Sequence, residues 1–308
     1  MVINTFADKS LLTLFIRLNK WSFNMAQTQN PLSGYFRSPK MYTKIPSGGK
    51  YYDEKVIDWP DTGELAIFPM TAKDEMIMKN PDALLNGEAV AQVILSCVPA
   101  VKQPRKLIGN DVDTLLIAVQ GATYGDEVTV EGPCTKCSHE NSGVASIEEC
   151  LDNMNHIEKS YEFETSQGLN IKVRPFTYDS TVKAGIANFK TTRSLQSLTN
   201  ITDEIDQLKA FNANFIQIAA LNFELIVDSV SSVSGTSPDG EEFVVTDSNA
   251  IREFLENCES SIGKSIEDKI TDINAIGIDK KFNLQCEECG NVYEKEIAFD
   301  PVNFFTAS

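Results

Sequence analysis

The hydrophobic and polar positions between residues 64 and 126 predict one short strand followed by several helices. Residues 65–69 form a compact apolar run that favours a strand. Thr71 is a good N-cap, and Asp74 and Glu75 fall in the first helical turn after it, where the helix dipole favours acids. That helix is expected to end near residue 78. We then expect a turn or short helix at 80–87, an apolar helix at 88–97 that Pro99 stops, and a helix at 110–123.

The pattern from residue 146 to residue 279 is mixed. Residues 161–164 and 170–175 alternate like the two strands of a hairpin that turns at Gln167 and Gly168. The remaining expected elements are helices at 178–189 and 203–228, a hairpin at 230–245 that turns at 237–240, and helices at 247–258 and 262–276.

The predicted helix at 203–228 carries apolar side chains at three- and four-residue steps. Such a stripe more often packs into a core than binds a partner, so we expect it to be buried. Its members are Ile205, Leu208, Phe211, Phe215, Ile218, Leu221 and Leu225.

Two CxxC pairs lie far apart in the chain, and each follows a short strand-like run, at residues 127–130 and 281–284. Two thiolates on one tight turn bind one face of a zinc ion, and two such turns complete a tetrahedron. The spacing therefore predicts one structural zinc ion in a zinc ribbon that a long insert divides. A full set of four protein ligands leaves no open position for a catalytic water. The expected ligands are Cys134, Cys137, Cys286 and Cys289.

Other interpretations of these residues stay open from sequence alone. A redox couple is disfavoured because neither pair opens a helix after a strand. The thiols can also be free and simply line two β-turns. His139 lies close enough to Cys137 to compete as a ligand, whereas His156 has no partner and is expected at the surface. Cys97 and Cys258 are most simply small core residues.

Composition narrows the classes of function. The chain has 308 residues and a formal net charge of −17. Such a field repels phosphate backbones and argues against the nucleic-acid binding that zinc ribbons otherwise suggest. It is compatible with a basic protein partner or simply with a solvated acidic surface. Seven cysteines, an odd number, fit a reducing compartment and a metal better than a set of disulfides.

No enzyme signature is present in the sequence. The phosphate-binding, dinucleotide-binding, zinc-protease and serine-hydrolase motifs are absent. The acidic pairs are more simply solvated faces or helix caps than acid–base pairs, and we expect a protein that is not an enzyme. These pairs are Asp111 and Asp113, Glu148 and Glu149, and Glu241 and Glu242.

The first 59 residues predict an N-terminal arm that is largely extended or disordered. The apolar run at 11–16 is too short to span a membrane, and no small-residue cleavage site follows it. Residues 1–24 are either non-native, with a start at Met25, or an amphipathic arm that docks elsewhere. Residues 25–55 are rich in proline, glycine and basic residues. They suggest either an extended clamp on a neighbouring subunit or a loop-rich segment wrapped on its own domain.

Several motifs resemble one protein family. They are PMTAKDE at 69–75, KNPDALLNG at 79–87, SCVP at 96–99, DTLLIA at 113–118, ATYGD at 122–126 and CTKC at 134–137, with CEECG at 286–290 and FDPVNFF at 299–305. Together they resemble the baseplate hub and hub-assembly proteins of T-even-like contractile-tailed bacteriophages. The likeness covers roughly residues 60–305.

The resemblance implies a non-enzymatic structural or assembly component of a phage tail baseplate hub. Such a protein would act by binding other baseplate or hub proteins, with no nucleic acid or membrane involved. It would be found in the virion tail, in the host cytoplasm during assembly, or both. A chaperone that does not remain in the virion is the alternative, and a zinc-ribbon nucleic-acid adaptor is the less favoured one.

Together these observations predict an α+β protein with a split zinc-ribbon-like element. The expected parts are an arm at 1–59, a helical segment with the first knuckle at 60–145, an inserted α/β region at 146–279, and the second knuckle with a C-terminal strand at 280–308.

Overall fold

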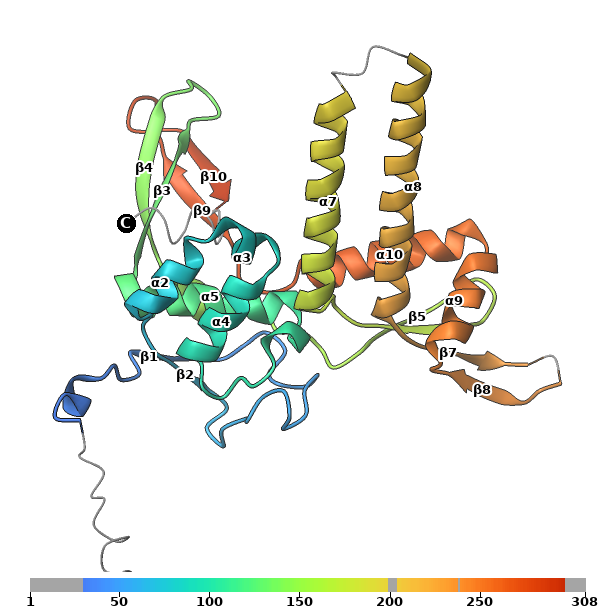
Figure 1. Ribbon diagram of the computed structural model, residues 1–308, viewed down its shortest axis with the longest axis horizontal. Helices are drawn as coiled ribbons and strands as arrows, with labels where there is room; N and C mark the ends of the chain where they lie inside the picture. The colour runs from blue at the N-terminus through green and yellow to red at the C-terminus, as the bar shows by residue number, and fades with distance from the viewer. Residues whose placement is uncertain (1–29, 199–203, 238, 297–308) are drawn as a thin grey trace, which may run out of the picture. The chain divides into compact units, whose positions relative to one another are not determined.

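The computed structural model describes residues 30–198, 204–237 and 239–296 (Figure 1). The chain divides into two compact units, one ending at Ser38 and the other beginning at Pro39. The described part of the first unit, residues 30–38, contains a 3-10 turn, η1 (Ser33–Tyr35). The expectations for residues 1–24 concern a part of the chain outside the described residues.

The second unit is a mixed α and β structure, as expected. Within the described residues it has nine α-helices and ten strands, and the strand pairs are antiparallel. The helices are α2 (Ala72–Met78), α3 (Pro81–Leu85), α4 (Glu88–Cys97), α5 (Gly109–Tyr124), α6 (Ile147–Asp152), α7 (Tyr178–Leu198), α8 (Glu204–Ser229), α9 (Ser248–Asn257) and α10 (Ser260–Asn274), with a 3-10 turn η2 (Pro104–Lys106). The strands are β1 (Met41–Thr43), β2 (Leu65–Ile67), β3 (Glu127–Pro133), β4 (Glu140–Ser146), β5 (Tyr161–Glu164), β6 (Asn170–Val173), β7 (Val230–Thr236), β8 (Glu242–Val245), β9 (Lys281–Gln285) and β10 (Val292–Glu296).

Local signals account for the helices between residues 71 and 124. The Thr71 hydroxyl accepts a hydrogen bond from the Asp74 N–H, and the Asp74 carboxylate accepts one from the Thr71 N–H, so a capping box begins α2. Asn80 caps α3, which has Pro81 in its first turn. The expected segments at 71–78, 80–87, 88–97 and 110–123 are confirmed.

The largest core gathers around α4 and α5 and includes residues from before β2. Ile45 and Ile57 are buried there, and β1 pairs with β2. Residues 25–55 had two interpretations, a clamp on a neighbouring subunit and a loop-rich segment wrapped on its own domain. From residue 39 onwards the structure has the wrapped segment. The clamp interpretation therefore concerns only the residues before Pro39.

A buried carboxylate attaches this wrapped segment to α5. Asp111, in the first turn of α5, accepts hydrogen bonds from the Ser47 N–H at 3.0 Å and from the Ser47 hydroxyl at 2.5 Å. It also accepts one from the Tyr52 hydroxyl at 2.5 Å. Of the two expectations for the acidic pairs, a solvated face or a helix cap, the solvated face was wrong for Asp111. It is completely buried in the first turn of α5, because residues 47–52 cover this turn of the helix.

A second core lies between a four-stranded sheet and two helices. The strand order is β5-β6-β7-β8, and the inner faces of β6 and β7 pack against the apolar stripes of α9 and α10. The predicted hairpin at 161–164 and 170–175 is confirmed. Asp247, the first residue of the helix expected at 247–258, caps α9 by accepting the Ala250 N–H at 2.9 Å.

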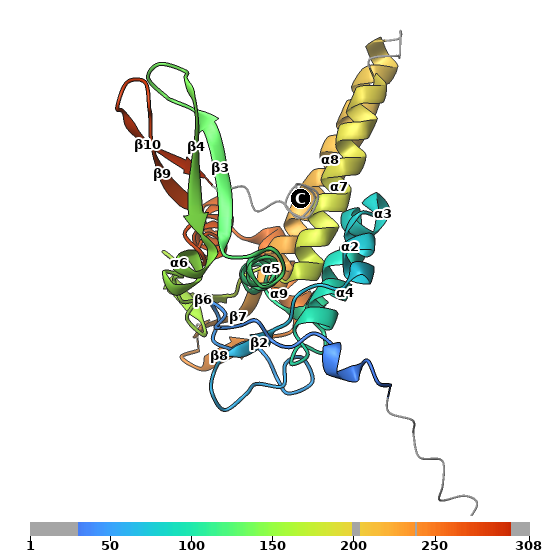
Figure 2. The same ribbon diagram turned by 90° about the vertical axis from the view of Figure 1, so that its left-hand side faces the viewer.

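The helices α7 and α8 connect the adjacent strands β6 and β7 and lie side by side in both views (Figure 1, Figure 2). The first turns of α7 lie against the start of α4. A Cβ atom added to Gly87, which has φ +72°, would lie 2.5 Å from the Val182 side chain. Helix α7 also continues past the expected end at Phe189 to Leu198.

The expectation that the apolar stripe of α8 is core was wrong over most of its length. Leu225 is buried, and Ile218 and Leu221 are half-buried. The outer positions are exposed because only the base of α8 is covered by α9, α10 and β7. These exposed members are Ile205, Leu208, Phe211 and Phe215.

The buried carboxyl of Asp111 predicts a specific pH dependence of stability. Burial raises the pKa of Asp111 from 3.8 to about 6, against the effect of the hydrogen bonds it accepts. Between these two values the unfolded chain releases the proton while the folded chain keeps it, so the contribution of this group to the unfolding free energy falls as pH rises. That loss amounts to roughly 3 kcal/mol and is complete above about pH 6. We expect Asp111→Asn to be more destabilising at pH 4 than at pH 7, by a difference of this size.

Urea unfolding of both chains at each pH, with EDTA present so that metal binding does not contribute, measures this difference. A cost of the substitution that is equal at the two pH values, or larger at pH 7, would contradict the assignment.

Candidate metal centre

Two hairpins that are remote in sequence meet at one place in the fold. The first is formed by β3 and β4 and the second by β9 and β10, and they lie side by side in both views (Figure 1, Figure 2). Each turn carries one cysteine pair. The two hairpins share a small apolar cluster: Val130, Cys134, Ala145, Leu284, Cys286 and Tyr293.

The four cysteine sulfurs converge. Their Sγ atoms all lie within 4.8 Å of one another. The sulfurs of Cys134 and Cys289 are 3.7 Å apart, and those of Cys137 and Cys286 are 3.5 Å apart. Four sulfurs bound at about 2.3 Å to a tetrahedral zinc ion would be about 3.8 Å apart. These two separations are close to the tetrahedral value, so the arrangement is compatible with a four-thiolate site, and each close pair is formed across the two hairpins.

The two turns have the same backbone geometry. The N–H of Cys134 donates to the carbonyl of His139, and the N–H of Cys286 donates to that of Asn291, both at 2.8 Å. In each turn the residue after the second cysteine has a left-handed conformation, with φ +59° at Ser138 and +68° at Gly290. Two unrelated stretches of sequence thus form equivalent knuckles.

Backbone N–H groups point at the sulfurs and shift their acidity. Burial would raise the pKa of Cys134, but the N–H groups of Lys136 and Cys137, with the neighbouring thiols, lower it to about 6. The N–H of Cys289 does most to lower the pKa of Cys286. For Cys137 the N–H of His139 acts in the same direction, but burial and the three nearby sulfurs outweigh it and raise the pKa to about 12.

A buried polar network connects the hairpins beside the cluster. The Tyr293 hydroxyl donates to the Gly132 carbonyl at 2.9 Å, and it accepts a hydrogen bond from the Asn141 amide at 3.1 Å. The Asn141 carbonyl oxygen in turn accepts the Glu287 N–H at 3.0 Å. Sequence analysis did not single out Asn141 or Tyr293. The only signal was that each lies four residues after the second cysteine of a pair.

The two histidines lie outside the sulfur cluster. His139 Nδ1 lies 3.3 Å from the Glu288 carboxylate, which pairs the two turns at their outer side, so the alternative of His139 as a ligand is not what this geometry favours. His156 is exposed, as expected. Cys97 is fully buried in the largest core, also as expected, whereas Cys258 is half-buried.

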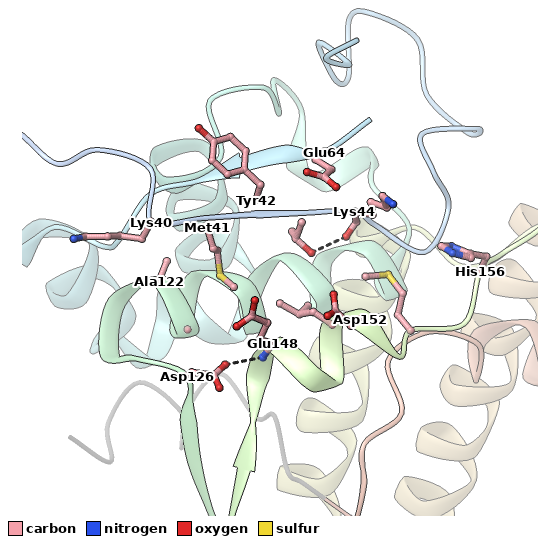
Figure 3. A pocket seen from close by; sticks show the side chains of 14 residues that line it. Lys40, Met41, Tyr42, Lys44, Glu64, Ala122, Asp126, Glu148, Asp152 and His156 are labelled. Atoms are coloured by element: carbon pink, nitrogen blue, oxygen red, sulfur yellow. Dashed lines mark hydrogen bonds between the residues drawn. The ribbon is translucent and has the colours of Figure 1, made fainter. Parts of the chain in front are cut away.

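A polar pocket of about 460 Å³ lies between β1 and the helices α5 and α6 (Figure 3). Met41 points into this space, and Tyr42 also lines it. The Asp126 carboxylate accepts a hydrogen bond from the Glu148 N–H at 2.7 Å and so stabilises the first turn of α6. The charged residues that line it are Lys40, Lys44, Glu64, Asp126, Glu148 and Asp152.

The matching left-handed positions give a test of the knuckle geometry. Gly290 has open space around it, so Gly290→Ala adds only backbone strain and should lower the unfolding free energy by about 1 kcal/mol. Ser138→Gly removes the same strain from the other knuckle and should raise the unfolding free energy by a few tenths of a kcal/mol. Thermal unfolding of the two variants measures the direction of each change in unfolding free energy.

The control is Gly263→Ala, at a helical position of α10 that also has open space and no positive φ. It should stabilise the protein by about 0.5–1 kcal/mol. If Gly290→Ala stabilised the chain as Gly263→Ala does, the knuckle conformation described here would be incorrect.

Comparison with known proteins identifies the family. A model of the family described as T4 bacteriophage base plate protein matches residues 39–306, which include both cysteine pairs. Searches of curated proteins and of solved structures returned no match. The resemblance noted in the motifs is thereby confirmed at the level of the baseplate. The chain belongs to the T4 bacteriophage base plate protein family and is a structural component of the phage tail baseplate.

Proposed function

We propose that this protein is a non-enzymatic subunit of the baseplate hub that works by binding other baseplate proteins. In this proposal one zinc ion, bound by Cys134, Cys137, Cys286 and Cys289, holds its two knuckles together. The observation that carries the zinc site is the convergence of four sulfurs from two distant turns to the spacing of a tetrahedron.

The donor set favours a structural role for the metal. Four thiolates occupy every position of a tetrahedral zinc ion, so no position is left for a water or a substrate. Cys134 and Cys286 are buried, whereas Cys137 and Cys289 are exposed. A metal whose four positions are all taken by protein ligands contributes to folding instead of activating a reactant.

The small size of the knuckle core supports the same role. The two hairpins share only a few buried side chains besides the cysteines, and two-stranded hairpins are marginally stable by themselves. Small cores of this kind usually depend on a metal or a disulfide. Zinc would supply the connection that the apolar contacts alone do not provide.

Charge supports a protein partner over a nucleic acid. The net charge of −17 opposes approach to a phosphate backbone, which makes a zinc-ribbon adaptor for nucleic acids the less favoured candidate.

Metal content and stability test the zinc site. The purified chain should contain one zinc ion, and Cys137→Ser or Cys286→Ser should weaken zinc binding by at least about 100-fold, because a four-sulfur site loses one ligand. EDTA should lower the melting temperature of the wild type by more than that of Cys286→Ser. The matched control is Cys258→Ser, in a half-buried thiol outside the cluster, which should retain zinc.

Co²⁺ in place of zinc gives an independent readout, because a tetrahedral four-sulfur site produces characteristic visible absorption. A wild-type chain that neither retains zinc nor responds to EDTA would reject the metal site. That outcome would leave membership of the baseplate family unaffected.

Cross-linking mass spectrometry of purified phage particles tests the hub assignment. We expect peptides of this chain in the particles, cross-linked to central hub proteins. Cross-links confined to peripheral baseplate proteins would reject the hub. Presence in assembly intermediates together with absence from finished particles would instead favour an assembly chaperone.

A further inference from the structure

The outer part of α8 exposes large apolar side chains along one face. Leu208 is 62% exposed, Phe211 52% and Phe215 65%. Steps of three and four residues place these three side chains on one side of a helix, and Ile216 lies at its edge. We call Leu208, Phe211, Phe215 and Ile216 the α8 stripe.

Helix α7 covers a different face of α8. In the outer part of α8, the half-buried residues on the side of α7 are Ala210 and Asn214, which are small or polar. The Asn214 amide donates a hydrogen bond to the Ser194 hydroxyl of α7 at 2.9 Å. The pair of helices therefore uses an alanine and an asparagine for its own contact while phenylalanines face solvent. This is the reverse of what burial of apolar surface within the chain would select.

The exposed area matches what a protein interface needs. Each large side chain of the stripe exposes on the order of 100 Å². The four side chains together give about 400 Å² of apolar surface. Since slightly more than half of a typical interface is apolar, this area corresponds to a contact of about 700 Å² per partner, close to the standard size.

The charge pattern makes a second copy of this chain the occupant that fits best. Residues 210–223 include no aspartate, glutamate, lysine or arginine. In a chain with a net charge of −17, most surfaces repel a second copy, whereas two uncharged stripes can meet without like-charge contact. We propose that two copies associate through their α8 stripes in a two-fold contact in which the two α7–α8 pairs form a four-helix bundle.

A membrane is a less suitable partner for this face. Residues 208–229 of α8 are long and apolar enough to cross a bilayer by length and composition. However, Leu225 and Val227 are buried in the protein, and α8 leads directly into β7 of the sheet. The part of α8 that remains exposed is shorter than the roughly 20 residues that a span requires.

Sedimentation velocity of the full chain, measured over a hundredfold range of micromolar and submicromolar concentration, tests this proposal. We expect a monomer–dimer equilibrium in the wild type. The double variant Leu208→Lys/Phe215→Lys should weaken it by at least about 30-fold, because it places charges at the centre of the contact. Both side chains are exposed in a single copy, so the variant should fold normally.

Gln217→Lys is the matched control. Gln217 is also exposed on α8, but it lies about 160° around the helix from Phe215 and about 100° from Ile216, so its charge should leave the dimer intact. A wild type that stays monomeric over the whole range overturns the proposal. The proposal is also overturned if the double variant dimerises as tightly as the wild type.

Hydrogen exchange of the wild type gives a readout that needs no variant. Amides of residues 208–222 should exchange more slowly at high protein concentration, while those of β8, where Val244 is also exposed, should not change. Exchange in α8 that is independent of concentration would overturn the proposal, as would a monomer that instead binds phosphatidylglycerol vesicles. None of these outcomes depends on the zinc site or on the hub.

Discussion

The convergence of two cysteine-bearing turns is the constraint on which the arrangement of the chain depends. It brings residues 134–137 and 286–289 together, so the chain between them forms one closed loop. The entropy of closing a loop rises only slowly with its length, by about 0.6 kcal/mol for each doubling. A long insert with its own sheet and core can therefore lie between the two knuckles at little more cost than a short one.

Buried polar groups reinforce this closure elsewhere in the fold. Asp111 connects to Ser47 across 64 positions of sequence, and Tyr293 connects to Gly132 across 161. A buried carboxylate or hydroxyl is costly unless its hydrogen bonds are made, so such groups permit few alternative arrangements of the segments they join. The apolar cores provide the bulk of the stabilisation, and these contacts specify which segments are neighbours.

A baseplate subunit also needs surface that stays available for other chains. The outer half of α8 provides it, because the fold buries the base of the helix and leaves phenylalanines exposed beyond it. The acidic remainder of the surface limits which partners can approach. The buried cores and the exposed apolar side chains of α8 thus occupy separate parts of the described structure.

The sequence by itself determined the features that depend on a few neighbouring residues. Thr71 and Asp74 form a capping box within one turn, and the spacing of each CxxC pair places two sulfurs on one turn, so these elements and the cysteine set were predictable. Only the tertiary structure decided which side of α8 is covered, that Asp111 is buried, and that His139 meets Glu288. The periodicity of a helix shows that its apolar residues share a face, but burial depends on what packs against that face. That information lies in segments distant along the chain.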